Sequence, residues 1–153
     1  MVGILETIIA GLGGTALMTL LMTIIHRSGW ARADMIRALG SLITRSYSGS
    51  LPPGVLLHSA AGAILAFPYA LVLGGLDVSS TAAMIGLGAL IGFVHGFVMG
   101  FILVAAVSEN HPVKQFQEAG FEVAAAHVLG HLAYGIGVGA IIGLMSIDLG
   151  FRF

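Results

Sequence analysis

Four long apolar stretches alternate with short polar ones along this chain of 153 residues. Each is long enough for a helix that crosses a bilayer, for which about 20 apolar residues suffice. The pattern predicts spanning helices over residues 2–26, 53–73, 81–107 and 120–145. We therefore expect an all-α polytopic membrane protein, a four-transmembrane-helix bundle in which residues 1–153 form a single transmembrane domain.

The longest polar segment follows the first apolar stretch, and its apolar residues recur at helical spacing. They follow the i, i+1, i+4, i+7, i+8 pattern of an amphipathic helix, and they are Met35, Ile36, Leu39, Leu42 and Ile43. We expect this helix over residues 31–45, lying in the headgroup layer of the membrane. A cap over the mouth of the bundle is the alternative.

Composition supports the membrane assignment. Hydrophobic residues make up 58% of the chain and charged residues only 8%, whereas soluble domains average about 25% charged residues. The lipid bilayer is thus an expected partner. The sequence has no basic patch, so a nucleic-acid partner is not expected. The absence of cysteine excludes disulfides, iron–sulfur clusters and thiolate metal sites.

The basic residues are concentrated in two of the polar segments. These segments contain Arg27, Arg32, Arg37, Arg45 and Lys114, whereas the termini and the remaining loop contain only Arg152. By the positive-inside rule, loops 27–52 and 108–119 are expected in the cytoplasm and both termini outside.

Glycines recur every four residues in the third and fourth apolar stretches. They are Gly88, Gly92, Gly96 and Gly100 in the third, and Gly135, Gly139 and Gly143 in the fourth. Stripes of small residues let membrane helices approach closely, so we expect these glycines to mediate helix packing.

Every apolar stretch carries at least one histidine. Counting the helical rise from the predicted cytoplasmic ends places His95 and His131 level with each other near the middle of the bilayer. His127 and Met99 fall nearer the cytoplasm, and His58 nearer still. His26 and His111 are expected near water, as ordinary surface residues.

Three chemistries fit these histidines. His95 and His131 could hold haem b between facing helices as a cofactor. A metal site for copper would draw on histidine and thioether ligands, namely His58, His95, Met99, His127 and His131. A proton relay or metal-ion path is the third, with Glu118 and Glu122 as the ion entrance. A purely structural role, as hydrogen-bonding groups between helices, stands beside all three.

Three segments resemble a known kind of protein. GLGGTALMTLLM in the first apolar stretch, DMIRALGSL in the first loop and GHLAYGIGVG in the last stretch are similar to segments of small, uncharacterised bacterial four-helix integral membrane proteins. The resemblance implies a compact four-span bundle in a bacterial inner membrane. It implies no activity, substrate or catalytic residue.

Catalytic motifs are missing from the sequence. There is no G-x-S-x-G nucleophile elbow and no H-E-x-x-H metal motif. We therefore expect a non-enzymatic subunit or accessory protein of a larger membrane assembly, partnered by other membrane subunits or by copies of itself, with a buried histidine and methionine site for haem or copper. The alternative is a small transporter or conduit for protons or metal ions.

Overall fold

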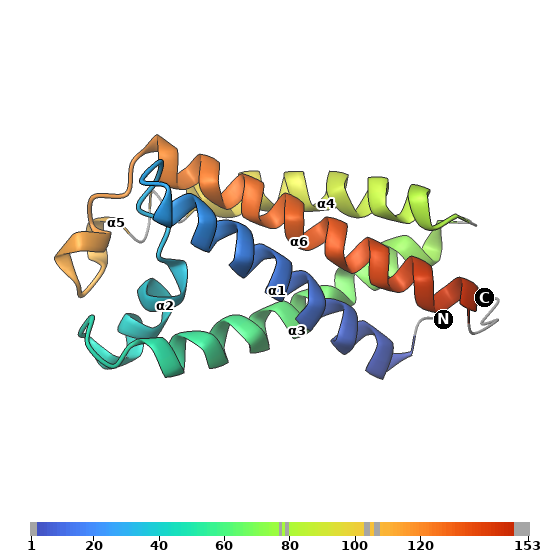
Figure 1. Ribbon diagram of the computed structural model, residues 1–153, viewed down its shortest axis with the longest axis horizontal. Helices are drawn as coiled ribbons and strands as arrows, with labels where there is room; N and C mark the ends of the chain where they lie inside the picture. The colour runs from blue at the N-terminus through green and yellow to red at the C-terminus, as the bar shows by residue number, and fades with distance from the viewer. Residues whose placement is uncertain (1–2, 77, 79, 103–104, 106–107, 149–153) are drawn as a thin grey trace.

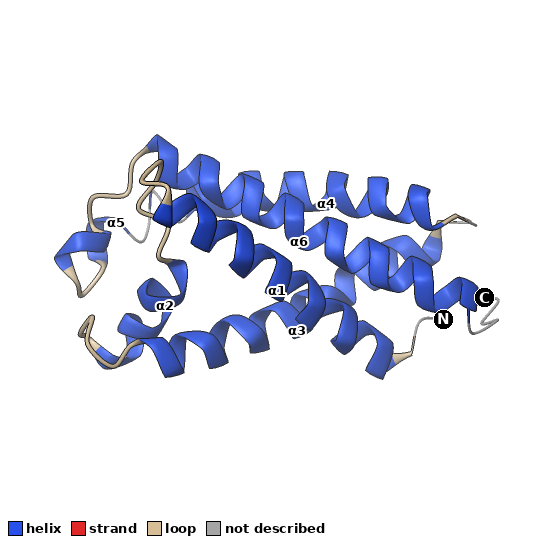
Figure 2. Cartoon of the chain, viewed as in Figure 1, coloured by secondary structure: helices blue, strands red, loops and turns tan. Residues whose placement is uncertain are grey.

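The computed structural model describes residues 3–76, 78, 80–102, 105 and 108–148, and helices make up most of that length (Figures 1 and 2). The long helices are α1 (Ile4–Arg27), α3 (Leu51–Gly75), α4 (Thr81–Ile102) and α6 (Phe121–Asp148). The short ones are α2 (Met35–Thr44), α5 (Ser108–Asn110) and a 3-10 turn at Lys114–Phe116. All four long helices are long and apolar enough to cross a membrane. The prediction of an all-helical chain with four such helices is confirmed.

The predicted amphipathic helix corresponds to α2, but it begins later than residue 31. Asp34 caps its first turn, because the carboxylate accepts a hydrogen bond from the backbone N–H of Arg37 at 3.4 Å. Its last turn stops at Arg45, which adopts the left-handed conformation with φ of 53°. Among the other helices, the predicted extension of the third span beyond Ile102 falls largely outside the described residues.

The four long helices form an incomplete ring. α6 packs along α4 on one side and along α1 on the other, and α1 in turn packs along α3. By contrast, α3 has only sparse contact with α4 and α6. A hydrogen bond between the Tyr69 hydroxyl and Nδ1 of His95, at 3.1 Å, joins α3 to α4. The gap between α3 and α4 is therefore the weakly closed side of the bundle.

The predicted glycine stripes lie where the backbones of α4 and α6 approach most closely. A Cβ atom on Gly92 would collide with the carbonyl oxygen of His131, and one on Gly135 with the carbonyl oxygen of Gly88. Gly96, Gly100, Gly139 and Gly143 likewise lie against backbone atoms of the opposite helix. Side chains at these positions would force α4 away from α6, so the glycines set the separation of the two helices.

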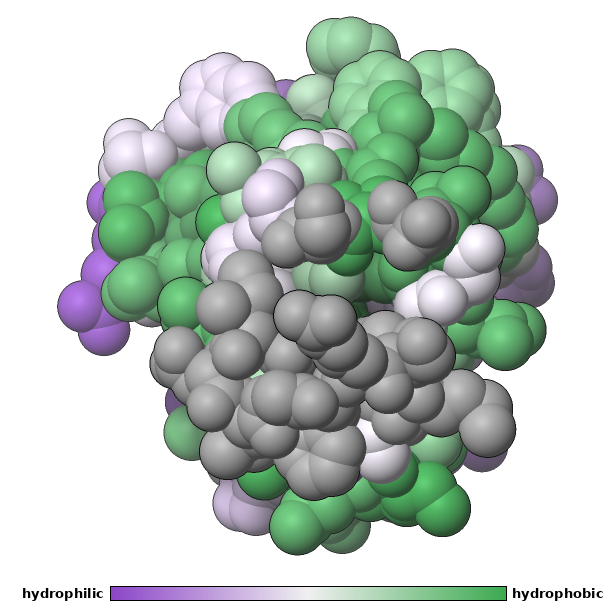
Figure 3. All heavy atoms as spheres, turned by 90° about the vertical axis from the view of Figure 1, so that its right-hand side faces the viewer, coloured by the Kyte–Doolittle hydropathy of each residue, from purple (hydrophilic) through white to green (hydrophobic). Residues whose placement is uncertain are grey.

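Figure 1 shows α2 and α5 at one end of the molecule, here called the loop end, and both termini at the opposite end, the terminal end. Seen from the terminal end, apolar side chains cover the flanks (Figure 3). Exposed apolar side chains of α3 include Leu71, Leu56 and Ile64, with exposed fractions of 78%, 71% and 67%. Such flanks are consistent with a multi-pass membrane protein in contact with lipid.

The interior differs between the two ends. Towards the terminal end the bundle is filled by fully buried side chains, including Leu73, Val138 and Ile142. Towards the loop end it is hollow. The candidate functional site lies in this hollow half.

Candidate functional site: a histidine-lined cavity

A cavity of about 200 Å³ occupies the loop-end half of the bundle. All four long helices contribute to its wall, through residues such as Thr15, His58, His95 and Tyr134. Met35, Ala38 and Leu39 of α2 line it from the loop end. Of the two positions considered for the amphipathic helix, these contacts support the cap over the mouth of the bundle.

The four histidines of the predicted site all line this cavity. His58, His127 and His131 are buried, with exposed fractions of 8%, 6% and 8%, and His95 is half-buried. The rings of His95 and His131 meet edge to face, with centroids 4.4 Å apart. The sequence placed these two residues at one depth because of their equal distance from the helix ends.

Backbone carbonyl groups fix how two of the imidazoles are protonated. Nδ1 of His127 lies 2.8 Å from the carbonyl oxygen of Val123, and Nδ1 of His131 lies 2.9 Å from that of His127. A carbonyl can only accept, so Nδ1 carries the hydrogen in both rings. In the neutral form of both rings, Nε2 is then a hydrogen-bond acceptor. No hydrogen bond to either Nε2 is found among the described residues.

His58 has an unsatisfied ring nitrogen. Its Nε2 is buried and has no hydrogen-bond partner in the described part of the chain. A buried polar atom without a partner costs about 1–3 kcal/mol. Because His58 also lines the cavity, a hydrogen-bonding group inside the cavity would relieve this cost.

Tyr134 lines the floor of the cavity and Tyr69 packs against it, and sequence reasoning missed both tyrosines. The Tyr134 hydroxyl donates a 2.6 Å hydrogen bond to the carbonyl oxygen of Gly62, which ties α6 to α3. Tyr69 meets the ring of Tyr134 edge to face at 5.3 Å and bonds His95. Tyr134 lies one helical turn beyond His131, and this i, i+3 spacing could have identified it.

The two carboxylates predicted as an ion entrance lie in different places. Glu118 is at the cavity mouth, where it forms a 2.7 Å ion pair with Arg32; the two side chains are 71% and 69% exposed. Glu122 is exposed and is not part of the lining, and its carboxylate lies beside Gly120. The guanidinium of Arg32 offsets the charge of Glu118, which weakens any attraction for cations.

The expectation that His111 is an ordinary surface residue is wrong. His111 is only 2% exposed. Its Nε2 lies 3.1 Å from the carbonyl oxygen of Ala38 in α2, and its ring packs against Phe116 at 4.9 Å. A loop histidine in a polar stretch gives no sign of such burial, which depends on α2 folding over the same end of the bundle.

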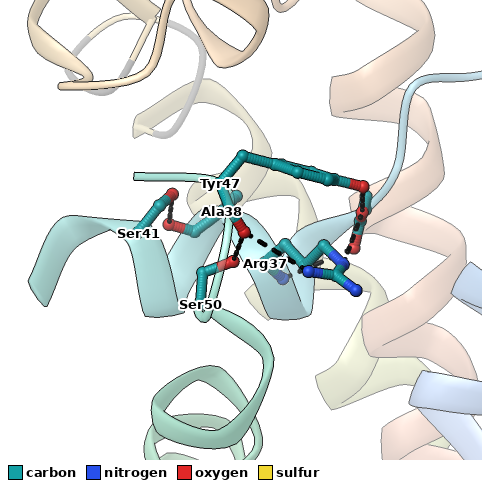
Figure 4. Close-up of polar contacts among 6 residues, drawn as sticks. Arg37, Ala38, Ser41, Tyr47 and Ser50 are labelled. Carbon is teal, nitrogen blue, oxygen red and sulfur yellow. Dashed lines mark hydrogen bonds and ion pairs between the residues drawn. The ribbon is translucent and has the colours of Figure 1, made fainter. Parts of the chain in front are cut away.

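The connection between α2 and α3 is held by polar contacts around Tyr47 (Figure 4). Its carbonyl oxygen accepts hydrogen bonds from Arg37 at 3.3 Å and from Ser50 at 2.7 Å. Its hydroxyl donates to Asp34 at 3.0 Å. The bond to the Asp34 carboxylate raises the pKa of Tyr47 above its ordinary value of 10.0. These contacts fix α2 over the cavity.

The metal and haem predictions find no support in this geometry. Met99 lines the cavity with the four histidines, but no three His, Asp or Glu side chains among the described residues are grouped to hold a metal ion. The edge contact of His95 with His131 leaves no gap for a flat macrocycle between the two rings. Both hypotheses stay predictions.

Comparison with models of protein families, with curated proteins and with solved structures gave no match. The resemblance to small bacterial four-helix membrane proteins therefore stays a prediction.

Proposed function

We propose that this chain is a non-enzymatic membrane protein that holds a small, uncharged and mostly apolar molecule in the loop-end cavity. The observation that carries the proposal is that His58 lines the cavity while its buried Nε2 has no hydrogen-bond partner among the described residues. Native proteins rarely leave such an atom unsatisfied, and a bound hydrogen-bonding molecule would explain it.

The polar groups of the cavity indicate a hydrogen-bond donor. Nε2 of His127 and Nε2 of His131 are acceptors, because Nδ1 of each ring donates to a carbonyl group. Small-molecule sites commonly combine an apolar wall with a few placed polar groups of this kind. A hydroxyl group on an apolar body matches both features.

The charges around the cavity favour an uncharged molecule. Two carboxylates line it, and both are engaged: Asp34 with Arg37 and Tyr47, and Glu118 with Arg32. Arg32 is the one cation in the lining among the described residues, and it is already paired. Burying an unpaired ion here would cost far more than burying a hydroxyl group.

Holding a molecule fits the cavity better than conducting ions. Beyond Tyr134 the interior is closed by the buried side chains of Leu73, Val138 and Ile142, so the cavity ends inside the bundle. A conduit predicts ion flux in proteoliposomes that falls when His131 is replaced. Equal flux with and without the protein would leave binding as the better account.

The haem and copper hypotheses have their own test. A Soret band, or stoichiometric copper, in protein purified from its native membrane would support them. Loss of either signal in His95→Ala and His131→Ala would assign the ligands.

The subunit hypothesis predicts that gentle detergent extraction yields a larger assembly than one chain.

The binding proposal is tested with phenol and anisole. Both have a benzene ring bonded to oxygen, but only phenol has a hydroxyl hydrogen to donate. A cavity of about 150 Å³ accommodates a benzene-sized molecule, so both probes fit by size. We expect phenol to bind the protein in nanodiscs about fivefold more tightly than anisole, as one added hydrogen bond implies. Saturation-transfer NMR measures both affinities.

The variants His127→Leu and His131→Leu are expected to remove the preference for phenol. His26→Leu is the matched control, because His26 is exposed and outside the cavity. Equal binding of phenol and anisole by the unaltered protein, or no binding of either, would contradict the proposal.

A further inference from the structure

Some residues of α3 and α4 that line the cavity are exposed or half-buried where these two helices have only sparse contact. Ala61 and Leu65 of α3 line the cavity and are also exposed at the molecular surface, Leu65 by 36%. Opposite them, His95 and Met99 of α4 line the cavity and are half-buried. We call the opening between these four residues the side portal.

The helix packing explains why the opening is there. Glycine contacts hold α4 against α6, and α1 separates α6 from α3 along much of their length. The bond between Tyr69 and His95 joins α3 to α4 at the floor of the cavity. On the loop side of this bond the two helices diverge (Figure 1).

The surface around the side portal is apolar. On α3 the neighbouring exposed residues are Leu57 and Ile64, and on α4 they are Val98 and Phe101. A surface of this kind on a spanning helix faces the hydrocarbon of the bilayer. The charged part of the cavity rim, Arg32 with Glu118, lies at the loop end instead.

From this arrangement we infer that the cavity takes its ligand directly from the bilayer, through the side portal, and that the ligand is a membrane-dissolved alcohol or phenol with a long apolar chain. Its hydroxyl group bonds the imidazoles inside the cavity, and its chain leaves between α3 and α4. The inference rests on the proposed binding function and names the ligand class and its route.

Size and chemistry both point to this class. A volume of about 200 Å³ holds a head group with a few carbons, since a cavity of about 150 Å³ is filled by benzene. A longer apolar chain has to leave the cavity, and the side portal leads into lipid. A phosphate or carboxylate head would need an unpaired cation, whereas the guanidinium of Arg32 is paired with Glu118.

The absence of cysteine from the chain permits a direct test of the route. Ala61→Cys places a thiol in the side portal, and Gln115→Cys places one at the exposed loop-end rim of the same cavity. Each variant is assembled in nanodiscs and treated with a bulky maleimide. The probe is a photoreactive long-chain alcohol dissolved in the bilayer, whose crosslinks are mapped by mass spectrometry.

We expect the unlabelled variants to be crosslinked at cavity residues. Labelling at position 61 should lower this crosslinking by about tenfold, the equivalent of ~1.4 kcal/mol in affinity, and labelling at position 115 should leave it unchanged. An excess of the matched long-chain alcohol should compete with the probe, and its methyl ether should not. Circular dichroism of each labelled sample verifies that the helices persist.

Four results would overturn the inference. If labelling at position 115 blocks capture and labelling at position 61 does not, the ligand enters from water and not from the bilayer. Equal competition by the alcohol and the ether excludes recognition of the hydroxyl hydrogen. Failure to capture the long-chain alcohol, while phenol still binds, refutes the lipid ligand but leaves the proposed binding function standing. Failure of both probes refutes the two proposals together.

Discussion

At the scale of single residues, the histidines of this protein differ in how their ring nitrogens are satisfied. His127 and His131 each donate from Nδ1 to the carbonyl oxygen four residues earlier in α6. This bond needs only the local helix geometry, so it follows from the sequence once the helix is known. By contrast, Nε2 of His58 has no hydrogen-bond partner among the described residues. The environment of this nitrogen depends on helices that are distant in the sequence.

The unsatisfied nitrogen of His58 leads to a first prediction. His58→Leu removes a buried polar atom without leaving a large void, so the ligand-free protein should gain about 1 kcal/mol in free energy of unfolding. The same change should weaken phenol binding. Denaturation in detergent measures the stability, with the exposed His26→Leu as a control expected within about 0.5 kcal/mol of the unaltered protein. A loss of stability in His58→Leu would mean that this nitrogen has a partner.

A second prediction concerns the pKa of Tyr47. The nearby Asp34 carboxylate, which accepts its hydroxyl hydrogen, raises this pKa above 10.0. The stabilising bond is therefore intact below about pH 10 and is lost as the pH rises through the raised pKa. Asp34→Asn should lower the pKa towards its ordinary value. Ultraviolet titration of the phenolate measures it, and Tyr47→Phe identifies which part of the signal belongs to Tyr47. An unchanged titration in Asp34→Asn would contradict the assigned cause.

At the scale of helices, glycines decide which pairs pack tightly. The contact of α4 with α6 is glycine on both sides. Two glycines also meet where α2 crosses the start of α3: a Cβ on Gly40 would lie 2.8 Å from the backbone nitrogen of Gly54. No comparable contact joins α3 to α4 in the described part of the chain. Close packing elsewhere thus leaves the cavity between α3 and the other helices.

A third prediction compares two glycines of α4. A Cβ on Gly88 would collide with the carbonyl oxygen of Gly135, whereas one on Gly86 would meet nothing within 4 Å. Gly88→Ala should cost about 1–3 kcal/mol in stability, as overpacking does. Gly86→Ala should be neutral or stabilising, because alanine favours the helix by up to ~1 kcal/mol. Thermal denaturation in detergent measures both, and equal effects would show that α4 is not held against α6 as described.

At the scale of the whole molecule, the distribution of charge matches the arrangement of the ends. The loops that the positive-inside rule assigns to the cytoplasm meet at the loop end, and both termini lie at the terminal end (Figure 1). The cavity mouth and its cap, α2, are on the loop end. If the rule holds, the capped end of the cavity faces the cytoplasm.

A fourth prediction tests this orientation with single cysteines in the cysteine-free chain. Ser46→Cys and Gln117→Cys are exposed at the loop end, and Leu76→Cys is exposed at the terminal end. A membrane-impermeant maleimide applied to intact cells should label position 76 and spare positions 46 and 117. Inverted vesicles should give the reverse pattern. Labelling of position 46 without position 117, from either side, would contradict a shared loop end.

The helices, and the levels of their side chains along the bundle, could be predicted from the sequence alone. Long uncharged stretches can satisfy their backbone hydrogen bonds in lipid only as helices, and four-residue spacing sets which residues share a face. From this followed the glycine stripes and the common level of His95 and His131. The ends of the helices were predicted less accurately from the sequence. The start of α2 is an example, because its Asp34 cap depends on one local hydrogen bond.

What lies between the helices could not be predicted from the sequence, because it depends on how the helices pack together. Whether α3 closes against α4 depends on the packing of all four helices at once, and no single stretch encodes it. That packing created the cavity, buried His111 under α2 and left Nε2 of His58 without a partner among the described residues. It also brought Tyr134 of α6 to Gly62 of α3. Spacing along one helix assigns residues to a face, whereas an enclosed space exists only once several faces are placed around it.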